Sequence, residues 1–246
     1  MDYCRVAAVV RAVYPPSQPV RQGGCRLALP SWRRRHDHAQ PHHRPARPHR
    51  FDGVDPRRVI GGFNSFLSEQ QAAPEPGTLT LVQFDSQDPY EVLHVFAPLH
   101  LVHPLDTSSY VPRASTPLYD ALGRAITDLD ARLAAIPEAL RPDRLLFVVV
   151  TDGHENASRE FNRAQVSRMI QARQEAGWEF IFLSADLSAF KDAQSMGMRA
   201  EAALLFGKHK RGNDAAWAMA SSKVRERRAG VTNQVAFNED ERKAAE

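Results

Sequence analysis

Two continuous apolar runs limit what this chain can fold into. They are "RLLFVVVTDG", residues 144–153, and "WEFIFLSAD", residues 178–186, and each ends in a polar turn. Runs of this kind are typical of strands buried on both faces of a parallel sheet. The stretch between them, residues 158–177, has the composition and length of a helix. The alternation predicts an α/β fold with a mostly parallel sheet, helices on both faces and right-handed crossovers.

The rest of the body follows the same alternation. Apolar spacing predicts a helix in residues 59–71 and a long helix in residues 118–136. Residues 78–86 and 90–99 are rich in β-formers and close enough to pair, which predicts one antiparallel edge strand. Ser158 and Gly177 are expected to cap the helix between the two apolar runs. The remaining expected elements are a short helix in 188–195, a short strand in 202–206 and a last helix in 213–229.

The amino-terminal segment differs sharply in composition. Residues 1–58 contain twelve Arg and four Asp but no Lys or Glu, whereas residues 59–246 contain twenty basic and twenty-five acidic residues. We predict a disordered leader, and a basic arm that binds nucleic acid or an acidic partner is the alternative. Both cysteines, Cys4 and Cys25, lie in the leader. A body without cysteine and a chain without a spanning segment predict a cytoplasmic protein that makes no membrane contact.

Two residues stand where polar groups could meet at the carboxyl ends of parallel strands. Asp152 follows the strand run directly, where its carboxylate could hold a hard divalent cation or could cap the next helix from a turn. Thr116, in "RASTPLYDAL", could offer its hydroxyl to a metal or phosphate. Alternatively, Ser115 or Thr116 could cap the following helix, with Pro117 as its first residue. The residues alone leave both alternatives open.

Taken together, "STPLYDA", "VVVTDGHENAS" and "AFNEDER" resemble a von Willebrand factor type A (vWA) domain of the bacterial stand-alone kind. The resemblance covers about residues 59–230, and "AFNEDER" is a further typical stretch within the charged tail of residues 231–246. It implies a Rossmann-like, doubly wound fold and a metal-ion-dependent adhesion site (MIDAS) that usually holds Mg²⁺. It also implies a protein-binding module, not an enzyme, whose partner offers an acidic group to the metal. By resemblance, Thr116 and Asp152 are two of the metal ligands.

The resemblance also implies a first strand and a D-x-S/T-x-S loop just before residue 59, and neither is present. Residues 42–58 stand there instead. Codons for Arg47–Gly53 can be chosen so that a one-base shift spells Asp-Arg-Thr-Gly-Ser-Met, which is a D-x-T-x-S loop. The same shift permits Ile-Thr-Val-Leu-Leu upstream and Glu-Ser-Ile-Arg downstream. The hypothesis is that residues 1–58 are read out of frame, and that the frame is restored near Val59.

Several consequences and alternatives follow from the missing loop. Thr116 and a single carboxylate predict Mg²⁺ binding that is weak or lost. "CRVAAVVRAVY" is the only amino-terminal stretch able to replace the missing central strand.

A nucleotide-binding enzyme of Rossmann type would need G-x-G-x-x-G, which "IGGFNSF" does not supply. The histidines of residues 36–49 match no standard zinc spacing, and Asp52 and Asp55, a possible substitute carboxylate pair, follow no apolar strand.

Overall fold

The computed structural model describes residues 5–12, 55–111 and 115–246, with residues 5–12 described as backbone only. Its strands form one six-stranded sheet in the order β3-β2-β1-β4-β5-β6. They are β1 (Arg5–Ala12), β2 (Gly77–Gln83), β3 (Glu91–Pro98), β4 (Arg144–Thr151), β5 (Glu179–Ser184) and β6 (Ala203–Leu205).

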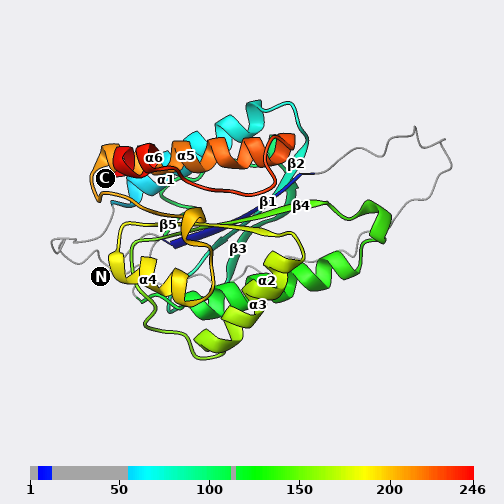
Figure 1. The fold of residues 1–246 in the computed structure, drawn as a ribbon, viewed down its shortest axis with the longest axis horizontal. Coiled ribbons are helices and arrows are strands. Elements are labelled where there is room, and N and C mark those ends of the chain that lie inside the picture. The colour runs from blue at the N-terminus through cyan, green and yellow to red at the C-terminus, as the bar shows by residue number, and fades with distance from the viewer. Residues whose placement is uncertain (1–4, 13–54, 112–114) are drawn as a thin grey trace.

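Helices cover both faces of this sheet, as the alternating pattern predicts. One layer contains α1, α5 and α6, and the other contains α2, α3 and α4 (Figure 1). The helices are α1 (Pro56–Ala72), α2 (Leu118–Ala134), α3 (Arg163–Glu175), α4 (Leu187–Ser195), α5 (Lys210–Ala229) and α6 (Glu239–Ala245). The mixed α/β class expected from the sequence is therefore confirmed.

The strand directions differ from the expected pattern in one respect. β4, β5 and β6 are parallel, and β3 pairs antiparallel with β2 at the edge of the sheet, as predicted. However, β1 is antiparallel to both of its neighbours, β2 and β4. The sheet therefore contains two reversed strands rather than the single antiparallel edge strand expected, and one of them lies in the interior of the sheet.

The prediction that the whole leader is disordered is wrong for Arg5–Ala12, which form β1. Ala8 stands opposite Leu81 of β2 on one side and Val148 of β4 on the other. Without a strand in this position, the backbone groups of two strands deep in the sheet would lack hydrogen-bond partners. The apolar stretch "RVAAVVRA" is the part of the leader suited to fill that position, as the sequence suggests. Residues 13–54 lie outside the described residues.

Helix α1 runs along the strands, from the end of the sheet at which β4, β5 and β6 finish to the end at which they begin. Near its start, the Arg58 guanidinium donates a hydrogen bond to the carbonyl of Lys208, just beyond the carboxyl end of β6 (2.8 Å). Its last turn is followed within a few residues by Gly77, the first residue of β2. β1 ends where β2 and β4 begin, because Ala12 is paired with Gly77 and with Arg144, the first residues of those strands. The end of β1 and the start of α1 thus lie at opposite ends of the strands (Figure 1).

Each face of the sheet has its own hydrophobic core. Under α1 and α5, the ring of Trp217 packs against Phe63 and Phe66, with ring centroids 6.2 and 5.9 Å apart. Under α2 and α3, Phe147 stacks on Trp178 and Phe180, at 5.6 and 5.0 Å. Aromatic contacts of this size contribute strongly to burial and hold the helix layers on the sheet.

Helix α3 ends where the sequence predicts but begins later than expected. Gly177 follows the helix with φ of +85°, a left-handed conformation that suits glycine, as expected at this end. The amino end lies further along the chain than predicted, because Asn162 and not Ser158 is the N-cap. Asn162 and Gln165 form a capping box, in which each side chain accepts a hydrogen bond from the other's backbone N–H. This reciprocal pair satisfies two donors where Ser158 could satisfy one.

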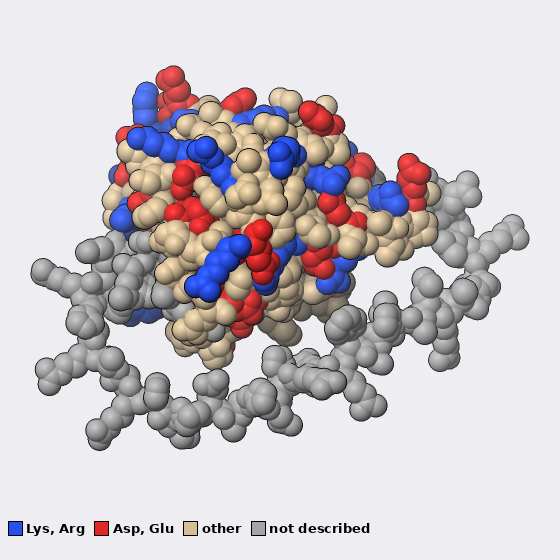
Figure 2. Space-filling view, turned by 90° about the horizontal axis from the view of Figure 1, so that it is seen from below, with Lys and Arg blue, Asp and Glu red and all other residues tan. Residues whose placement is uncertain are grey.

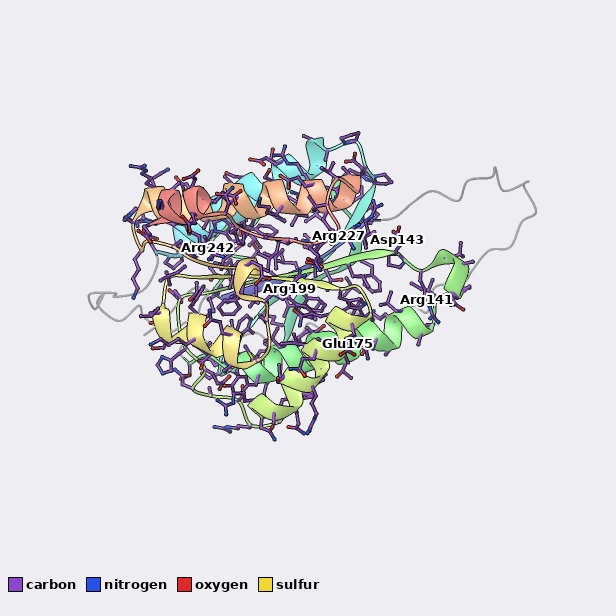
Figure 3. The ribbon with its side chains drawn as sticks, in the orientation of Figure 1. Arg141, Asp143, Glu175, Arg199, Arg227 and Arg242 are labelled. Atoms are coloured by element: carbon purple, nitrogen blue, oxygen red, sulfur yellow. The ribbon has the colours of Figure 1, made fainter. Side chains whose placement is uncertain are left out.

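The last sixteen residues do more than form a charged tail. They carry α6, and they bury Val235, Phe237 and Ala245. Arg242 of α6 (Figure 3) donates to the carbonyl oxygens of Ala203 and Ala200, at 2.7 and 3.0 Å. These contacts fasten the segment across the β6 end of the sheet, so it packs as part of the domain.

Candidate functional site

The two candidate ligands lie in neighbouring loops at the edge where the parallel strands end. Asp152 is the first residue after β4, and Thr116 precedes α2 by two positions. The Thr116 N–H donates to the side-chain oxygen of Asn156 (2.7 Å), and the Asn156 N–H donates to the Thr116 carbonyl (3.0 Å). This reciprocal pair ties the two loops together, and Thr116 and Asp152 are both wholly buried.

The Thr116 side chain does not cap α2. The N-cap position is Pro117, whose side chain cannot cap, and the first-turn N–H groups of Tyr119 and Asp120 donate instead to Glu155 and Ser158 of another loop. Among the described residues, the Thr116 hydroxyl has no hydrogen-bond partner at all, although it is buried. Burying an unpaired hydroxyl costs about 1–3 kcal/mol. The capping alternative therefore does not hold for Thr116, and its hydroxyl remains a candidate ligand.

Asp152 does not cap a helix either. The next helix, α3, begins ten residues later and is capped by Asn162. The neighbouring Thr151 closes the turn after β4, because its hydroxyl donates to the Gly153 carbonyl (2.9 Å). Asp152 itself is fully buried at this turn. The capping role that the sequence left open for Asp152 is therefore not the role it has.

Asp120 holds the loop that carries Asn156. Its carboxylate accepts three backbone hydrogen bonds, from Arg159 (2.8 Å), Glu160 (2.9 Å) and Phe161 (2.8 Å). Asp120 lies in the first turn of α2 and is nearly buried. Because it links residues some forty positions apart, sequence reasoning did not identify it. The only sequence signal was an acidic residue inside "STPLYDA".

Glu155 reinforces the same loop from within. It accepts hydrogen bonds from the backbone N–H groups of Tyr119 (2.9 Å), Ala157 (2.9 Å) and Ser158 (2.8 Å). Ser158, which the sequence suggested as a helix cap, instead donates its hydroxyl to Glu155 (2.7 Å) and accepts from the Asp120 N–H (3.1 Å). The run "HENAS" therefore serves to fix the loop after Asp152 against the start of α2.

A polar cleft of about 700 Å³ opens beside these loops. Arg124 of α2 and Glu160, which both line it, form an ion pair, and this contact raises the pKa of Arg124 and lowers that of Glu160. The cleft is lined by Asp85, Ser86, Pro89, Ser115, Pro117, Asp120, Arg124, Asn156, Ala157, Ser158, Arg159 and Glu160. Its lining of hydroxyls, amides and paired charges suits a polar partner surface better than an apolar ligand.

Among the described residues, Thr116 and Asp152 are the two candidate metal ligands at this site. Mg²⁺ prefers a near-octahedral set of oxygen ligands, and a single protein carboxylate leaves most of that set to water. Thr116 and Asp152 offer a hydroxyl and a single carboxylate. Within residues 5–12, 55–111 and 115–246, no three His, Cys, Asp or Glu side chains are grouped so that they could hold a metal. The donor set therefore does not fit tight binding.

Asp55, one of the two substitute carboxylates considered from the sequence, has another role in the structure. Asp55 is the N-cap of α1 and accepts a hydrogen bond from the Arg57 N–H (2.9 Å). Its carboxylate also pairs with the Arg57 guanidinium, which lowers the pKa of Asp55. Asp55 thus has a structural role in starting α1. Asp52 and the histidines of residues 36–49 lie outside the described residues.

Replacing Thr116 by valine tests whether its hydroxyl is unpaired. Valine keeps the shape and removes a buried polar group, so we expect the free energy of unfolding to stay level or to rise by about 1 kcal/mol. Thr151→Val is the matched control, because the Thr151 hydroxyl is also buried but is hydrogen-bonded to Gly153. We expect that control to lower stability by about 1 kcal/mol in urea unfolding. Equal losses in both variants would contradict an unpaired Thr116.

Replacing Asp120 by alanine removes the acceptor of three backbone hydrogen bonds. Hydrogen bonds to charged groups contribute about 1.5–3 kcal/mol each, and losses within one network do not add. We therefore expect a loss of about 3 kcal/mol in unfolding free energy, with faster amide exchange in residues 153–161. Asp128→Ala, at a half-buried position of the same helix where the carboxylate accepts hydrogen bonds from the side chains of Tyr90 and Arg132, is the control and should cost about 1 kcal/mol. Similar losses in the two variants would show that Asp120 does not hold the loop.

Comparisons of the chain with protein-family models, with curated proteins and with solved structures gave no match. Among the helices in the described part of the chain, none is both long and apolar enough to cross a membrane.

Proposed function

We propose that this chain is a vWA-like protein-binding module with an incomplete metal site. In this proposal the sheet corresponds to a Rossmann-like, doubly wound sheet in which β1 occupies the place of the first strand. The partner would be a protein that offers an acidic group, and the binding edge would be formed by the loops at Thr116 and Asp152. The proposal assigns no catalytic reaction to the chain.

The observation that carries the proposal is the state of Thr116. Its hydroxyl is buried and unpaired among the described residues, in a loop that Asn156 ties to the loop of Asp152. Asp120 and Glu155 fix this arrangement with backbone hydrogen bonds. Two loops held in place beside each other, with a hydroxyl that no other group uses, favour a binding site from which the D-x-S/T-x-S loop is missing.

The position of α1 supports the identity of the missing part. α1 begins at the edge where β4, β5 and β6 end, so a strand parallel to β4 would deliver the chain to it through a short loop. β1 runs in the opposite direction and ends at the far edge. The shifted reading of residues 42–56 supplies an apolar strand, a D-x-T-x-S loop and a helix start in the order that this position of α1 requires.

The proposal predicts weak metal binding by the chain with its printed sequence. We expect that titration of Mg²⁺ into the protein in a calorimeter gives no saturable binding tighter than about 1 mM. The Asp152→Ala variant should give the same flat titration, because a single carboxylate and a hydroxyl hold Mg²⁺ poorly. Tight binding that Asp152→Ala abolishes would show that the site is complete after all, and would contradict the proposal of an incomplete site.

The charge distribution on the face formed by α2, α3 and α4 does not favour a nucleic-acid interface there. The face formed by α2, α3 and α4 shows Lys and Arg interspersed with Asp and Glu (Figure 2). Several of these charges are paired, as in Arg173 with Asp130 (2.8 Å) and Arg132 with Asp128 (2.8 Å). Nucleic acid binding relies on a basic patch that neutralises phosphates. We therefore propose a protein partner and place nucleic acid outside the function of this face.

A further inference from the structure

Two arginines are buried side by side in the last turn of α5. Arg227 and Arg228 are only 7% and 1% exposed. In the part of the chain that the structure describes, neither of them forms an ion pair. A buried charge without a counter-charge is costly, and buried arginines are normally paired with an anion. The carboxyl end of a helix compensates roughly half a unit charge, so most of this positive charge is not balanced.

Arg228 donates hydrogen bonds to neutral oxygens only. Its Nη1 donates to the Gln70 carbonyl (2.9 Å) and to the Gln70 side-chain oxygen (2.8 Å), and its Nη2 donates to the Glu75 carbonyl. A guanidinium carries five N–H groups, so these three bonds leave two of them unused. One is on Nη2 and the other is on Nε, which has no partner among the described residues. The bonds hold the guanidinium in one position but leave its charge unbalanced.

A cavity of about 380 Å³ opens beside Arg228. It lies between the end of α1, the loop that leads to β2, and the 3₁₀ helix Leu99–Leu101. Burial lowers the pKa of Arg228, and the Glu75 carboxylate, which also lines the cavity, offsets this effect only in part. Glu75 and Arg228 do not form an ion pair. The cavity therefore presents a fixed cation for which the described residues supply no counter-ion.

We propose that this cavity binds a small oxyanion, a carboxylate or a phosphate, on the Arg228 guanidinium. A guanidinium matches the geometry of both anions, and hydrogen bonds between two charged groups are among the strongest in proteins. The His100 ring lies on the wall of the same cavity and supplies a further polar group. The cavity is large enough for the anion and for a small group attached to it.

This site is separate from the loops of Thr116 and Asp152. Gly77 lines the cavity and stands opposite Ala12 of β1, which in turn stands opposite Arg144, the first residue of β4. Asp152 follows the last residue of β4 and so lies at the other end of the strands. The inference therefore does not depend on the proposed function.

The Nε–H signal of Arg228 in an NMR spectrum reports binding directly. A buried N–H group exchanges slowly with water, so the signal is observable, and in labelled protein it is assigned through its bonds to the Arg228 backbone. Sodium acetate and inorganic phosphate are titrated separately, with sodium chloride keeping the ionic strength constant. We expect a saturable shift for at least one of these anions, with half-saturation below about 10 mM. The backbone amides of Gly77 and His100 give a second readout of the same cavity.

Two variants separate this site from non-specific binding. Glu75→Gln removes a negative charge from the cavity wall, so we expect it to tighten anion binding at least threefold. Arg225→Lys is the matched control, because Arg225 lies three positions before Arg228 but pairs with Glu69 (3.4 Å), and it should leave the titration unchanged. If neither the Nε–H signal nor the amides respond to either anion, the cavity takes no oxyanion and the proposal is wrong. A response that Glu75→Gln does not strengthen would place the anion elsewhere and would equally overturn it.

Discussion

Replacing Val9 by proline is expected to unfold the protein or to lower its unfolding free energy by about 3 kcal/mol or more. Val9 lies in the middle of β1, opposite Thr80 of β2 and Phe147 of β4. Every N–H group of a strand with neighbours on both sides has a hydrogen-bond acceptor nearby. Proline removes one donor, and its ring disrupts the pairing. Typical domains have only about 5–15 kcal/mol of stability, so this is a large share.

Leu187→Pro is the matched control for that variant. Leu187 is the first residue of α4, is half exposed, and follows Asp186 in an extended conformation, which suits a residue before proline. We expect this variant to unfold within about 0.5 kcal/mol of the original chain in urea. If Val9→Pro were equally harmless, Arg5–Ala12 would not be a central strand, and the sheet would need a different occupant between β2 and β4.

The periodic elements of the body could be predicted from the sequence because their signals are local. The buried runs gave β4 and β5, and the close spacing of β2 and β3 gave their antiparallel pairing. The role of β1 was harder to predict. The composition of "RVAAVVRA" indicates a strand, but not where the strand lies in the sheet or in which direction it runs. Its place is set by the backbone N–H and C=O groups of β2 and β4, which need a strand between them, and no short stretch of sequence contains that information.

The candidate site shows the same division between local and distant information. Resemblance led to Thr116 and Asp152, and the structure places their loops side by side. The residues that fix these loops, Asp120 and Glu155, could not be predicted. Their bonds join α2 to a loop some forty residues away, and only the fold brings the two segments together. Asp120 looked like an ordinary acidic residue in a helix's first turn.

Replacing residues 42–56 by the sequence that a one-base frame shift would encode is expected to produce the largest functional change. The variant replaces residues 42–56 by Ile-Thr-Val-Leu-Leu-Asp-Arg-Thr-Gly-Ser-Met-Glu-Ser-Ile-Arg, which provides a five-residue apolar strand and a D-x-T-x-S loop before α1. This loop adds a carboxylate and two hydroxyls to the edge that holds Thr116 and Asp152. A second carboxylate converts a poor donor set into one suited to Mg²⁺. The new strand would also replace β1 and lead directly into α1.

Mg²⁺ calorimetry on the restored chain, the printed chain and the restored chain with Asp152→Ala tests the central claim most directly. We expect the restored chain to bind Mg²⁺ at least about 100-fold more tightly than the printed chain, a difference of about 2.7 kcal/mol. Asp152→Ala should remove that gain. If the restored chain folds but binds Mg²⁺ no better than the printed chain, the loop does not belong at this edge and the account of an incomplete vWA-like site is wrong.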